Sequence, residues 1–531
     1  LEIPMQTDPT FNEVTTFFQP HTLNRMAQIL EERRKRLTGE SQILTTSLPI
    51  EQPVTNVQIP AEVGGESNSA SPTNKGVNEI QSEDHTERSR NTSVKPAAQN
   101  GLGAVIQVDS NTAKSEKVEP EKLQVTEVQK EDLNPPTFEV LLGDNTPTPQ
   151  FGILGRSGNR TVAIDLNGCN TISLFGVQGG GKSYTLGSIV EMATKELPKI
   201  NQLPSPLATV IFHYNESQDY APEFVTMVKP NSKEQEIQKL ADDYGAKPAS
   251  LDDVLLLTTP DKLVERQEEF PSIRVEPIYF HSSELSIKDW KFLMSAVSNQ
   301  SMYITQITMI MRKDRSELTL DNLLKGIEAS SLNQNQKELA LMRLNFAGQF
   351  INDSYRLAEK LKPGRMIIVD VRDELIEQDE ALGLFVVMLN IFANAGRDFN
   401  KLVVFDEAHK YMSNQDLTSH IVEVVRQMRH QGVSIMIASQ DPPSLPLAII
   451  ELSSIMLLHR FNSANWLKHI QKAQVALDEL TPVQLVNLMP GEAYTWANKS
   501  TDQSFTSRAV KVKCRPRVTQ HGGSTKTAIS R

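Results

Sequence analysis

Three consecutive glycines, a lysine and a serine stand together in the stretch "GVQGGGKSYTLG" at 176–187. The stretch matches the pattern G-x-x-x-x-G-K-[ST] from Gly176 to Ser183. It lies between a run that predicts a strand (171–175) and a run that predicts a helix (183–197), which is the context that this motif requires. Glycines there let backbone N–H groups face phosphate oxygens, helped by the positive end of the helix. The sequence therefore predicts a nucleoside triphosphate site.

Each residue of this motif has a chemical task. Lys182 is expected to reach the β- and γ-phosphates of ATP, and the Ser183 hydroxyl is expected to ligate Mg²⁺. The alternative, a flexible turn that fits the pattern by chance, is disfavoured by the flanking strand and helix. The predicted nucleotide-binding residues are Gly176, Gln178, Gly179, Gly180, Gly181, Lys182, Ser183 and Tyr184.

Two acids follow a second apolar run, "LVVFDE" at 402–407. At the end of a buried strand, Asp406 could hold Mg²⁺ through water, and Glu407 could act as the general base toward an attacking water. A paired acid favours hydrolysis over binding alone, because a binding switch needs no base. The alternative is that both acids cap the next helix.

A glutamine ends the next predicted strand, "VSIMIASQ" at 433–440. If that strand lies beside the acid-bearing strand, Gln440 would reach the γ-phosphate and orient water; otherwise it is an ordinary polar residue at a strand end. Arginine could stabilise the charge that develops during phosphoryl transfer, and ring ATPases often take it from a neighbouring subunit. The candidates are Arg426, Arg429 and Arg460, with a structural ion pair as the alternative for each.

Apolar runs alternate with helical segments from Phe138 onward, which indicates a parallel sheet covered on both faces. The predicted fold class is α/β, with a RecA-like P-loop NTPase core, a mainly parallel sheet, an inserted helical subdomain and a disordered N-terminal region. The expected strands are 208–214, 254–259, 277–281, 365–371, 401–407, 433–440 and 454–461, after short β-like runs before the glycine loop.

The domain boundaries follow changes in composition. No Phe, Tyr or Trp occurs between Phe18 and Phe138, and such a segment cannot bury enough apolar surface to offset its chain entropy. We expect a short helical segment at 1–39, because its apolar residues at 22–37 have helical spacing, and a disordered linker at 40–134. A small β-rich lead-in at 135–168 precedes an ATPase domain at 169–510, which has a helical insertion at about 284–362. A flexible basic tail is expected at 511–531.

Overall composition sets limits on partners and compartment. The net charge of −11 excludes a globally basic nucleic-acid coat but permits a local basic channel. No apolar run reaches the roughly 18–20 residues that span a bilayer. The cysteines, Cys169 and Cys514, support neither a disulfide framework nor a zinc site, so a reducing cytoplasm is expected.

Taken together, the motifs resemble the HerA–FtsK superfamily of ring-forming DNA-pumping ATPases, and within it the HerA-like branch. The matching pieces cover about 136–510 and include "DLNGCNTISLFGVQGGGKSYTLG", "GRMIIVDVRDELIEQDEALGLFVVMLNIFA", "VVFDEAHKYM", "RQMRHQGVSIMIASQDP" and "LMPGEAYTW". The resemblance implies a hexameric ring with sequence-independent, double-stranded DNA in its channel and ATP at subunit boundaries. It gives Lys182, Ser183, Asp406, Glu407 and Gln440 the nucleotide roles described above.

The sequence departs from this superfamily in two places. The arginine that often follows the glutamine is replaced by Asp441, so an arginine role must come from elsewhere. The lead-in at 136–168 is too short for the β-barrel with which HerA-like proteins dock a nuclease or other effector, so a nuclease partner is less strongly implied. Candidate DNA contacts are Arg312, Lys313, Arg315 and Lys410, each of which could instead be an ordinary solvated charge.

Two functions follow from these features. The first is an ATP-hydrolysing ring motor that translocates on or unwinds DNA. The second is an ATP-dependent assembly platform or regulatory P-loop ATPase that scaffolds an effector such as a nuclease, with DNA transport secondary. DNA-dependent turnover would favour the motor. A conjugative coupling ATPase is a third hypothesis, which the missing membrane segment disfavours.

Overall fold

The computed structural model describes residues 135–296, 301–313, 318–412 and 415–523. All of them lie in one compact unit, Pro120–Arg531. The helical segment and the linker predicted for 1–39 and 40–134 lie outside the described residues. Among the described residues, no helix combines the length and the apolar character needed to cross a membrane.

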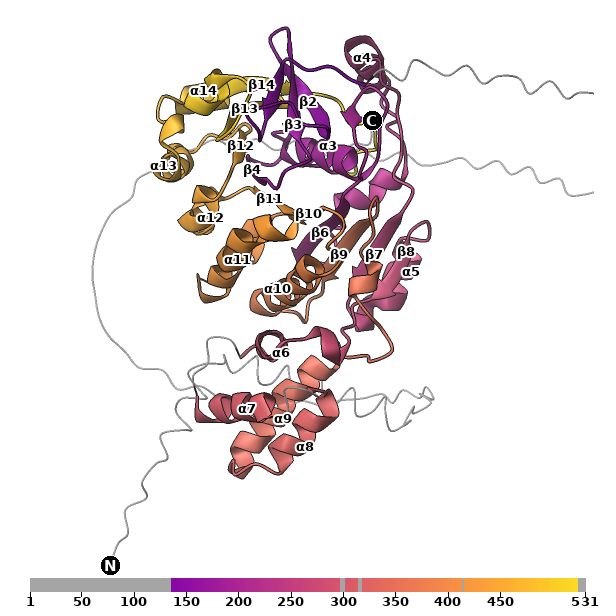
Figure 1. The fold of residues 1–531 in the computed structure, drawn as a ribbon, viewed down its shortest axis with the longest axis vertical. Coiled ribbons are helices and arrows are strands. Elements are labelled where there is room, and N and C mark those ends of the chain that lie inside the picture. The colour runs from indigo at the N-terminus through magenta and orange to yellow at the C-terminus, as the bar shows by residue number, and fades with distance from the viewer. Residues whose placement is uncertain (1–134, 297–300, 314–317, 413–414, 524–531) are drawn as a thin grey trace, which may run out of the picture. The chain divides into compact units, whose positions relative to one another are not determined.

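The strands of this unit form one 14-stranded sheet, parallel over its larger part (Figure 1). In order across the sheet, the parallel strands are β8 (Arg274–Pro277), β7 (Val254–Thr258), β9 (Met366–Arg372), β6 (Ala208–Asn215), β10 (Lys401–Phe405), β11 (Val433–Ser439), β4 (Thr171–Phe175) and β12 (Ile455–Leu458). Next come β13 (Glu492–Ala497), β14 (Val510–Cys514), β2 (Phe151–Ser157) and β3 (Arg160–Asp165), each antiparallel to the strand before it; β1 (Val140–Leu142) lies parallel to β3, and β5 (Asn201–Gln202) pairs with β2.

The central strands are apolar because both faces of the sheet are covered. Along β6, Phe212 packs in one core against Phe385 of α10 (Gln378–Asn394), with ring centroids 4.6 Å apart. The next residue toward the N-terminus, Ile211, belongs to the opposite core together with Ile189 of α3 (Lys182–Thr194). This alternation confirms the predicted α/β class, with β11 inserted between the strand of the glycine loop (β4) and the strand of the paired acids (β10).

Helices fill the connections between strands. Four of them, α6 (Ile287–Leu293), α7 (Met302–Lys313), α8 (Leu320–Glu328) and α9 (Gln334–Gly348), lie between β8 and β9, and α6 packs on α10. The remaining α-helices of the described residues are α4 (Glu234–Tyr244), α5 (Leu263–Glu269), α11 (Gln415–Met428), α12 (Leu447–Glu451), α13 (Ala464–Ala473), α14 (Pro482–Val486) and α15 (Gln503–Ser507).

The strand predicted at 277–281 is wrong. The strand here is β8, which ends at Pro277 and is followed by one more hydrogen bond to β7, from the N of Ile278 to the O of Thr258 at 2.7 Å. Beyond it, Phe280 makes only an isolated bridge to Ile351.

The flexible tail predicted from 511 is also wrong as far as residue 523. Val510, Val512 and Cys514 alternate with lysines, which is the period of a strand, and β14 pairs with both β13 and β2. Beyond β14, Arg515 and Arg517 are fully buried. Residues 524–531 lie outside the described residues.

Candidate nucleotide site

The glycine loop turns from β4 into α3 and leaves the first N–H groups of the helix open. Gly179 and Gly181 have φ values of 75° and 98°, a left-handed conformation that glycine adopts without strain. A Cβ on Gly181 would also lie 2.7 Å from the backbone N of Gly491. The loop can therefore keep this shape only with glycine, and its N–H groups are available to an anion.

Lys182, the first residue of α3, is buried and points at the acid-bearing strand. Its Nζ lies 2.9 Å from Oε1 of Glu407, although 225 residues separate the two in sequence. Burial alone would lower the pKa of this lysine, but the carboxylates of Glu407 and Asp406 outweigh it and raise the pKa. Lys182 is thus a fixed cation at the helix N-terminus, held in place by an anionic side chain.

The paired acids follow the last residue of β10. Asp406 is buried, and its Oδ1 has no hydrogen-bond partner among the described residues. Glu407 has φ 49° and ψ 43°, a left-handed conformation that is rare for a residue with a side chain and costs about 1–3 kcal/mol. Strain and an open buried carboxylate oxygen are features typical of a binding or catalytic site.

Gln440 follows β11, the strand beside β10. Its Nε2 donates to Oε1 of Glu407 at 2.8 Å, so one carboxylate oxygen faces both Lys182 and Gln440. Its backbone N donates to Nδ1 of His409 at 3.4 Å, and that nitrogen also lies 3.4 Å from Oε2 of Glu407. Burial, together with the positive charges nearby, lowers the pKa of His409. The structure therefore brings the predicted lysine, glutamate and glutamine into direct contact.

The arginine candidates are not brought into this group. Arg426 is exposed near the end of α11, and Arg429 begins the 3₁₀ turn Arg429–Gln431 that precedes β11. Both positions lie at the amino edge of the parallel strands, whereas the phosphate loop lies at the carboxyl edge. Arg460 is exposed, and its backbone O accepts from the N of Val177 at 3.0 Å. Arg460 is the one of the three that borders the glycine loop of its own chain.

Tyr184, predicted to bind nucleotide, has its hydroxyl engaged elsewhere. The hydroxyl donates to Oε2 of Glu236 at 2.6 Å and accepts from the backbone N of Arg517 at 2.8 Å. Burial and the neighbouring Glu236 raise the pKa of this tyrosine well above its usual value. The phenol therefore helps to hold the fold together, and its ring remains part of a cavity wall.

One cavity of about 1760 Å³ joins these groups. It is lined by the glycine loop, Lys182, Ser183, Asp406, Glu407 and Gln440, and also by His213, Glu223, His409 and His521, which the sequence did not single out.

Two of the four residues that the sequence analysis missed carried a signal: His213 interrupts an otherwise apolar strand, and His409 follows the paired acids directly. His213 now lies with Nδ1 3.7 Å from Oδ2 of Asp406. Glu223 and His521 carried no local signal. No cluster of three or more His, Cys, Asp or Glu side chains suited to a metal ion occurs among the described residues.

Comparison with known proteins finds similarity at the level of structure. No protein-family model and no curated protein sequence matches the chain. Similar solved structures include VirB4 of Thermoanaerobacter pseudethanolicus (TM-score 0.43, 14% identity, 70% of this chain and 98% of that chain covered). Others are plasmid coupling protein TrwB in complex with ADP and Mg²⁺ (0.40, 12%, 71% and 96%) and the genome packaging NTPase B204 from Sulfolobus turreted icosahedral virus 2 (0.30, 10%, 66% and 99%).

These structures share only 10–14% identity with the chain, so they do not show its family or single out a branch of the group that the sequence motifs resemble. At TM-scores below 0.5 the similarities carry no argument about activity. The class of the protein rests on its own topology and site. A glycine loop between β4 and α3, an inserted strand β11, and paired acids after β10 define a P-loop NTPase fold.

Proposed function

We propose that this chain is an ATP-hydrolysing motor that assembles into a hexameric ring and translocates on or unwinds DNA. The observation that supports the proposal most strongly is the meeting of Lys182 and Gln440 on one oxygen of Glu407, 2.9 Å and 2.8 Å away. A cation, a candidate base and an amide converge at the open N-terminus of α3, which is the arrangement that phosphoryl transfer to water requires.

ATP binding uses the glycine loop and Lys182. The N–H groups of the loop and the positive end of α3 bind phosphate oxygens, and Lys182 pairs with the β- and γ-phosphates. The ion pair with Glu407 shows that the ammonium already accommodates an anionic oxygen at this position. Phosphate oxygens replace that carboxylate when ATP binds, which frees Glu407 for another partner.

Ser183 and Asp406 fit a magnesium ion. Mg²⁺ is commonly held by one or two protein ligands together with substrate phosphates, so a dedicated cluster of acids is not needed. The buried Oδ1 of Asp406, which has no hydrogen-bond partner among the described residues, is a free oxygen for this purpose. When bound, the ion neutralises charge on the phosphates.

Hydrolysis uses Glu407 and Gln440. Released from Lys182, the Glu407 carboxylate accepts a proton from the attacking water, and the Gln440 amide orients that water. With this left-handed backbone, the Glu407 side chain contacts Lys182 at the start of α3. An arginine from a neighbouring subunit would complete the site: Arg426 and Arg429 lie at the far edge of the sheet from their own phosphate loop, and Arg460 borders it.

DNA as a partner is proposed from the resemblance to DNA-pumping ATPases. Arg312 and Lys313 end α7, both exposed, and are available for phosphate contacts. Lys410 is less available, because it is half-buried with its Nζ 5.6 Å from the ring centre of Tyr220. Arg315 lies outside the described residues. Cys169 and Cys514 form no disulfide in the described residues, which fits the proposed cytoplasmic setting.

The test is the rate of ATP hydrolysis with and without double-stranded DNA, together with a mass measurement of the nucleotide-bound assembly. A motor gives DNA-stimulated turnover and a ring mass. The second candidate, an assembly platform that scaffolds an effector such as a nuclease, gives the same ring with turnover that DNA leaves unchanged. The β1–β3 lead-in joins the main sheet through β14 and forms no separate barrel for an effector in the described residues, so we propose the motor first.

A further inference from the structure

After β14 the chain crosses α3 and is held there by one buried carboxylate. Glu191 of α3 is fully buried, and its Oε1 accepts from Nη1 of Arg515 at 2.6 Å and from the N of Val518 at 3.0 Å. Its Oε2 accepts from both the N and the Oγ1 of Thr519, at 3.0 Å and 2.7 Å. Four donors from the segment Arg515–Gly523 therefore converge on a single side chain of the helix that carries the phosphate loop.

The surface of α3 is shaped for this segment. A Cβ on Gly187 would lie 2.4 Å from the guanidinium of Arg517, so the absence of a side chain there makes room for the arginine. Arg515 also donates from Nη2 to the O of Ser188 at 3.0 Å. Both arginines are fully buried, and their contacts are complementary to glycine and to backbone carbonyls of the helix.

The opposite side of the segment pairs with the connection that follows β6. The N of Asn231 and the N of Ala249 both donate to the O of Val518, at 2.9 Å and 3.0 Å. The N of Gln520 donates to the O of Lys229 at 2.8 Å. Because hydrogen bonds hold the segment on both sides, it is a fixed part of the fold and can form one wall of the cavity.

The end of this segment lines the nucleotide cavity. Pro516, His521, Gly522 and Gly523 share the cavity with the phosphate loop and with the ring of Tyr184. The rings of Tyr184 and His521 meet edge to face, with centroids 5.2 Å apart. His521 Nδ1 lies 3.4 Å from Oε1 of Glu223, which fixes the imidazole from behind. A Cβ on Gly522 would lie 2.7 Å from the O of Glu223, so this part of the wall is bare backbone.

We infer that the segment Arg515–Gly523 forms the subsite for the nucleobase and ribose of the bound nucleoside triphosphate. The inference rests on the proposed function and extends it. In a P-loop the backbone N–H groups up to the start of the helix bind the phosphates, so sugar and base continue past Tyr184 into the cavity that this wall encloses. A proline ring, an imidazole and bare glycine backbone offer flat, weakly polar surface, which suits the face of a base.

The test compares ATP with inorganic tripolyphosphate, which occupies the phosphate positions and has no base. Affinities are measured by displacement of a fluorescent ATP analogue or by calorimetry. Two truncations form a matched pair: a stop after Gln520 removes His521, Gly522 and Gly523, whereas a stop after Gly523 keeps them. His521→Ala is a second, milder variant, and His430→Ala, at the amino edge of the sheet before β11, is its control.

We expect the stop after Gln520 and His521→Ala to weaken ATP binding about tenfold, the loss of roughly one contact with a base. Tripolyphosphate binding stays unchanged in both, and the stop after Gly523 and His430→Ala bind ATP as the full chain does. The inference is overturned if both variants keep full ATP affinity, or if ATP and tripolyphosphate weaken together. Failure of the proposed function looks different, because then the full chain binds neither ligand.

Discussion

Two buried charged clusters lie at the carboxyl edge of the same sheet, and they are built differently. At the end of β9, Arg372 donates to both oxygens of Asp370 at 2.9 Å and 2.7 Å and to Glu269 at 2.9 Å. Arg266 of α5 adds a second guanidinium, with Nε 3.1 Å from Oδ2 of Asp370. Arg266 also pairs with Glu265 at 3.0 Å, so two arginines face three carboxylates and the cluster is closed by opposite charges.

The cluster around Lys182 is open by comparison. One ammonium faces two carboxylates, an oxygen of Asp406 has no hydrogen-bond partner among the described residues, and Glu407 is strained. Buried charge that serves only stability is expected to be fully paired, because an unpaired charge is costly. The contrast indicates that the β9 cluster joins α5 to the sheet, whereas the β10 cluster keeps capacity for a ligand.

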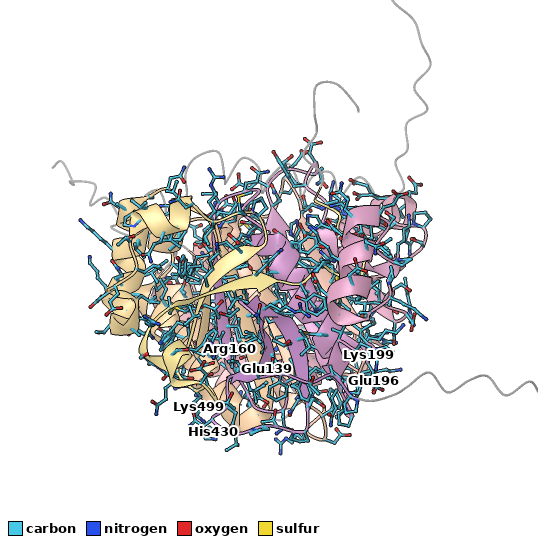
Figure 2. All side chains as sticks on the ribbon, turned by 90° about the horizontal axis from the view of Figure 1, so that it is seen from above. Glu139, Arg160, Glu196, Lys199, His430 and Lys499 are labelled. Atoms are coloured by element: carbon cyan, nitrogen blue, oxygen red, sulfur yellow. The ribbon has the colours of Figure 1, made fainter. Side chains whose placement is uncertain are left out.

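Glu407→Gln is expected to have the largest effect, and it tests whether the β10 cluster serves ATP hydrolysis. Removing a general base is expected to lower kcat by about 10²–10⁴-fold, while ATP still binds because Lys182 and the glycine loop are intact. Single-turnover hydrolysis and equilibrium binding measure the two effects separately. Glu196→Gln is the matched control, since Glu196 is exposed and lies with the other labelled residues toward the lower side of the view in Figure 2. Equal loss of binding and hydrolysis would contradict the assignment.

The closed cluster should respond to mutation in the opposite way. Asp370→Ala leaves two buried guanidinium groups short of an anion and is expected to cost about 3–5 kcal/mol of unfolding free energy. Urea denaturation measures this loss, and ATP affinity of the folded fraction stays unchanged. Asp253→Ala is the control, because its ion pair with Arg365 is half exposed on the aspartate side and is expected to contribute at most about 1 kcal/mol. A large drop in ATP affinity with normal stability would reverse the two roles.

Lys182→Ala tests the open cluster from the side of the cation. ATP affinity is expected to fall about 100-fold or more, since a buried charge-assisted contact contributes roughly 3 kcal/mol. Calorimetric titration of ATP measures the change, with Lys499→Ala, an exposed lysine labelled in Figure 2, as control. If the variant binds ATP as the wild type does, the glycine loop alone holds the phosphates and the convergence has no functional meaning.

Acidification is expected to lower the free energy of unfolding through a histidine beside the glycine loop. His459, buried beside the glycine loop, donates from Nδ1 to the O of Glu492, and burial lowers its pKa from 6.5 to about 4. Below about pH 6.5 His459 is protonated in the unfolded chain but stays neutral in the native protein. Its contribution to the free energy of unfolding is therefore full above that pH and is lost as the pH falls toward 4. By linkage the loss is roughly 2 kcal/mol between pH 6.5 and 5.

Urea midpoints at pH 7.5 and 5 check this prediction. His459→Gln should show a smaller change between the two pH values than the wild type, and His430→Gln, an exposed histidine, should match the wild type. Identical pH dependence in all three would show that His459 is protonated in the native state. The arginines of the closed cluster do not titrate in this range.

Local patterns in the sequence predicted the centre of the fold and most of the site. The glycine loop and the paired acids are short motifs at strand ends, and parallel strands bring such ends together, so the contact of Lys182 with Glu407 followed from topology. Gln440 was predictable for the same reason once β11 was placed beside β10. The roles of these residues remain predictions that the variants above test.

The position of the segment Arg515–Gly523 could not be predicted, because the residues that it contacts are far away in the sequence. Arg515 and Arg517 resemble a basic, flexible tail until Glu191 and Glu223 are known to meet them, and each pair is separated by more than 290 residues. The end of β8 at Pro277 was missed because the apolar residues after it predicted a strand. The position of an arginine finger depends on a neighbouring subunit and has no local signature in this chain.

The central claim is that the lysine of the glycine loop and the acids after β10 act on one magnesium-bound triphosphate. Phosphate release from ATP in magnesium buffer, measured for the wild type beside the same protein with magnesium chelated, tests it most directly. The account predicts steady turnover that requires magnesium and disappears in Glu407→Gln. Protein that is folded yet neither retains nor cleaves ATP in magnesium would contradict it.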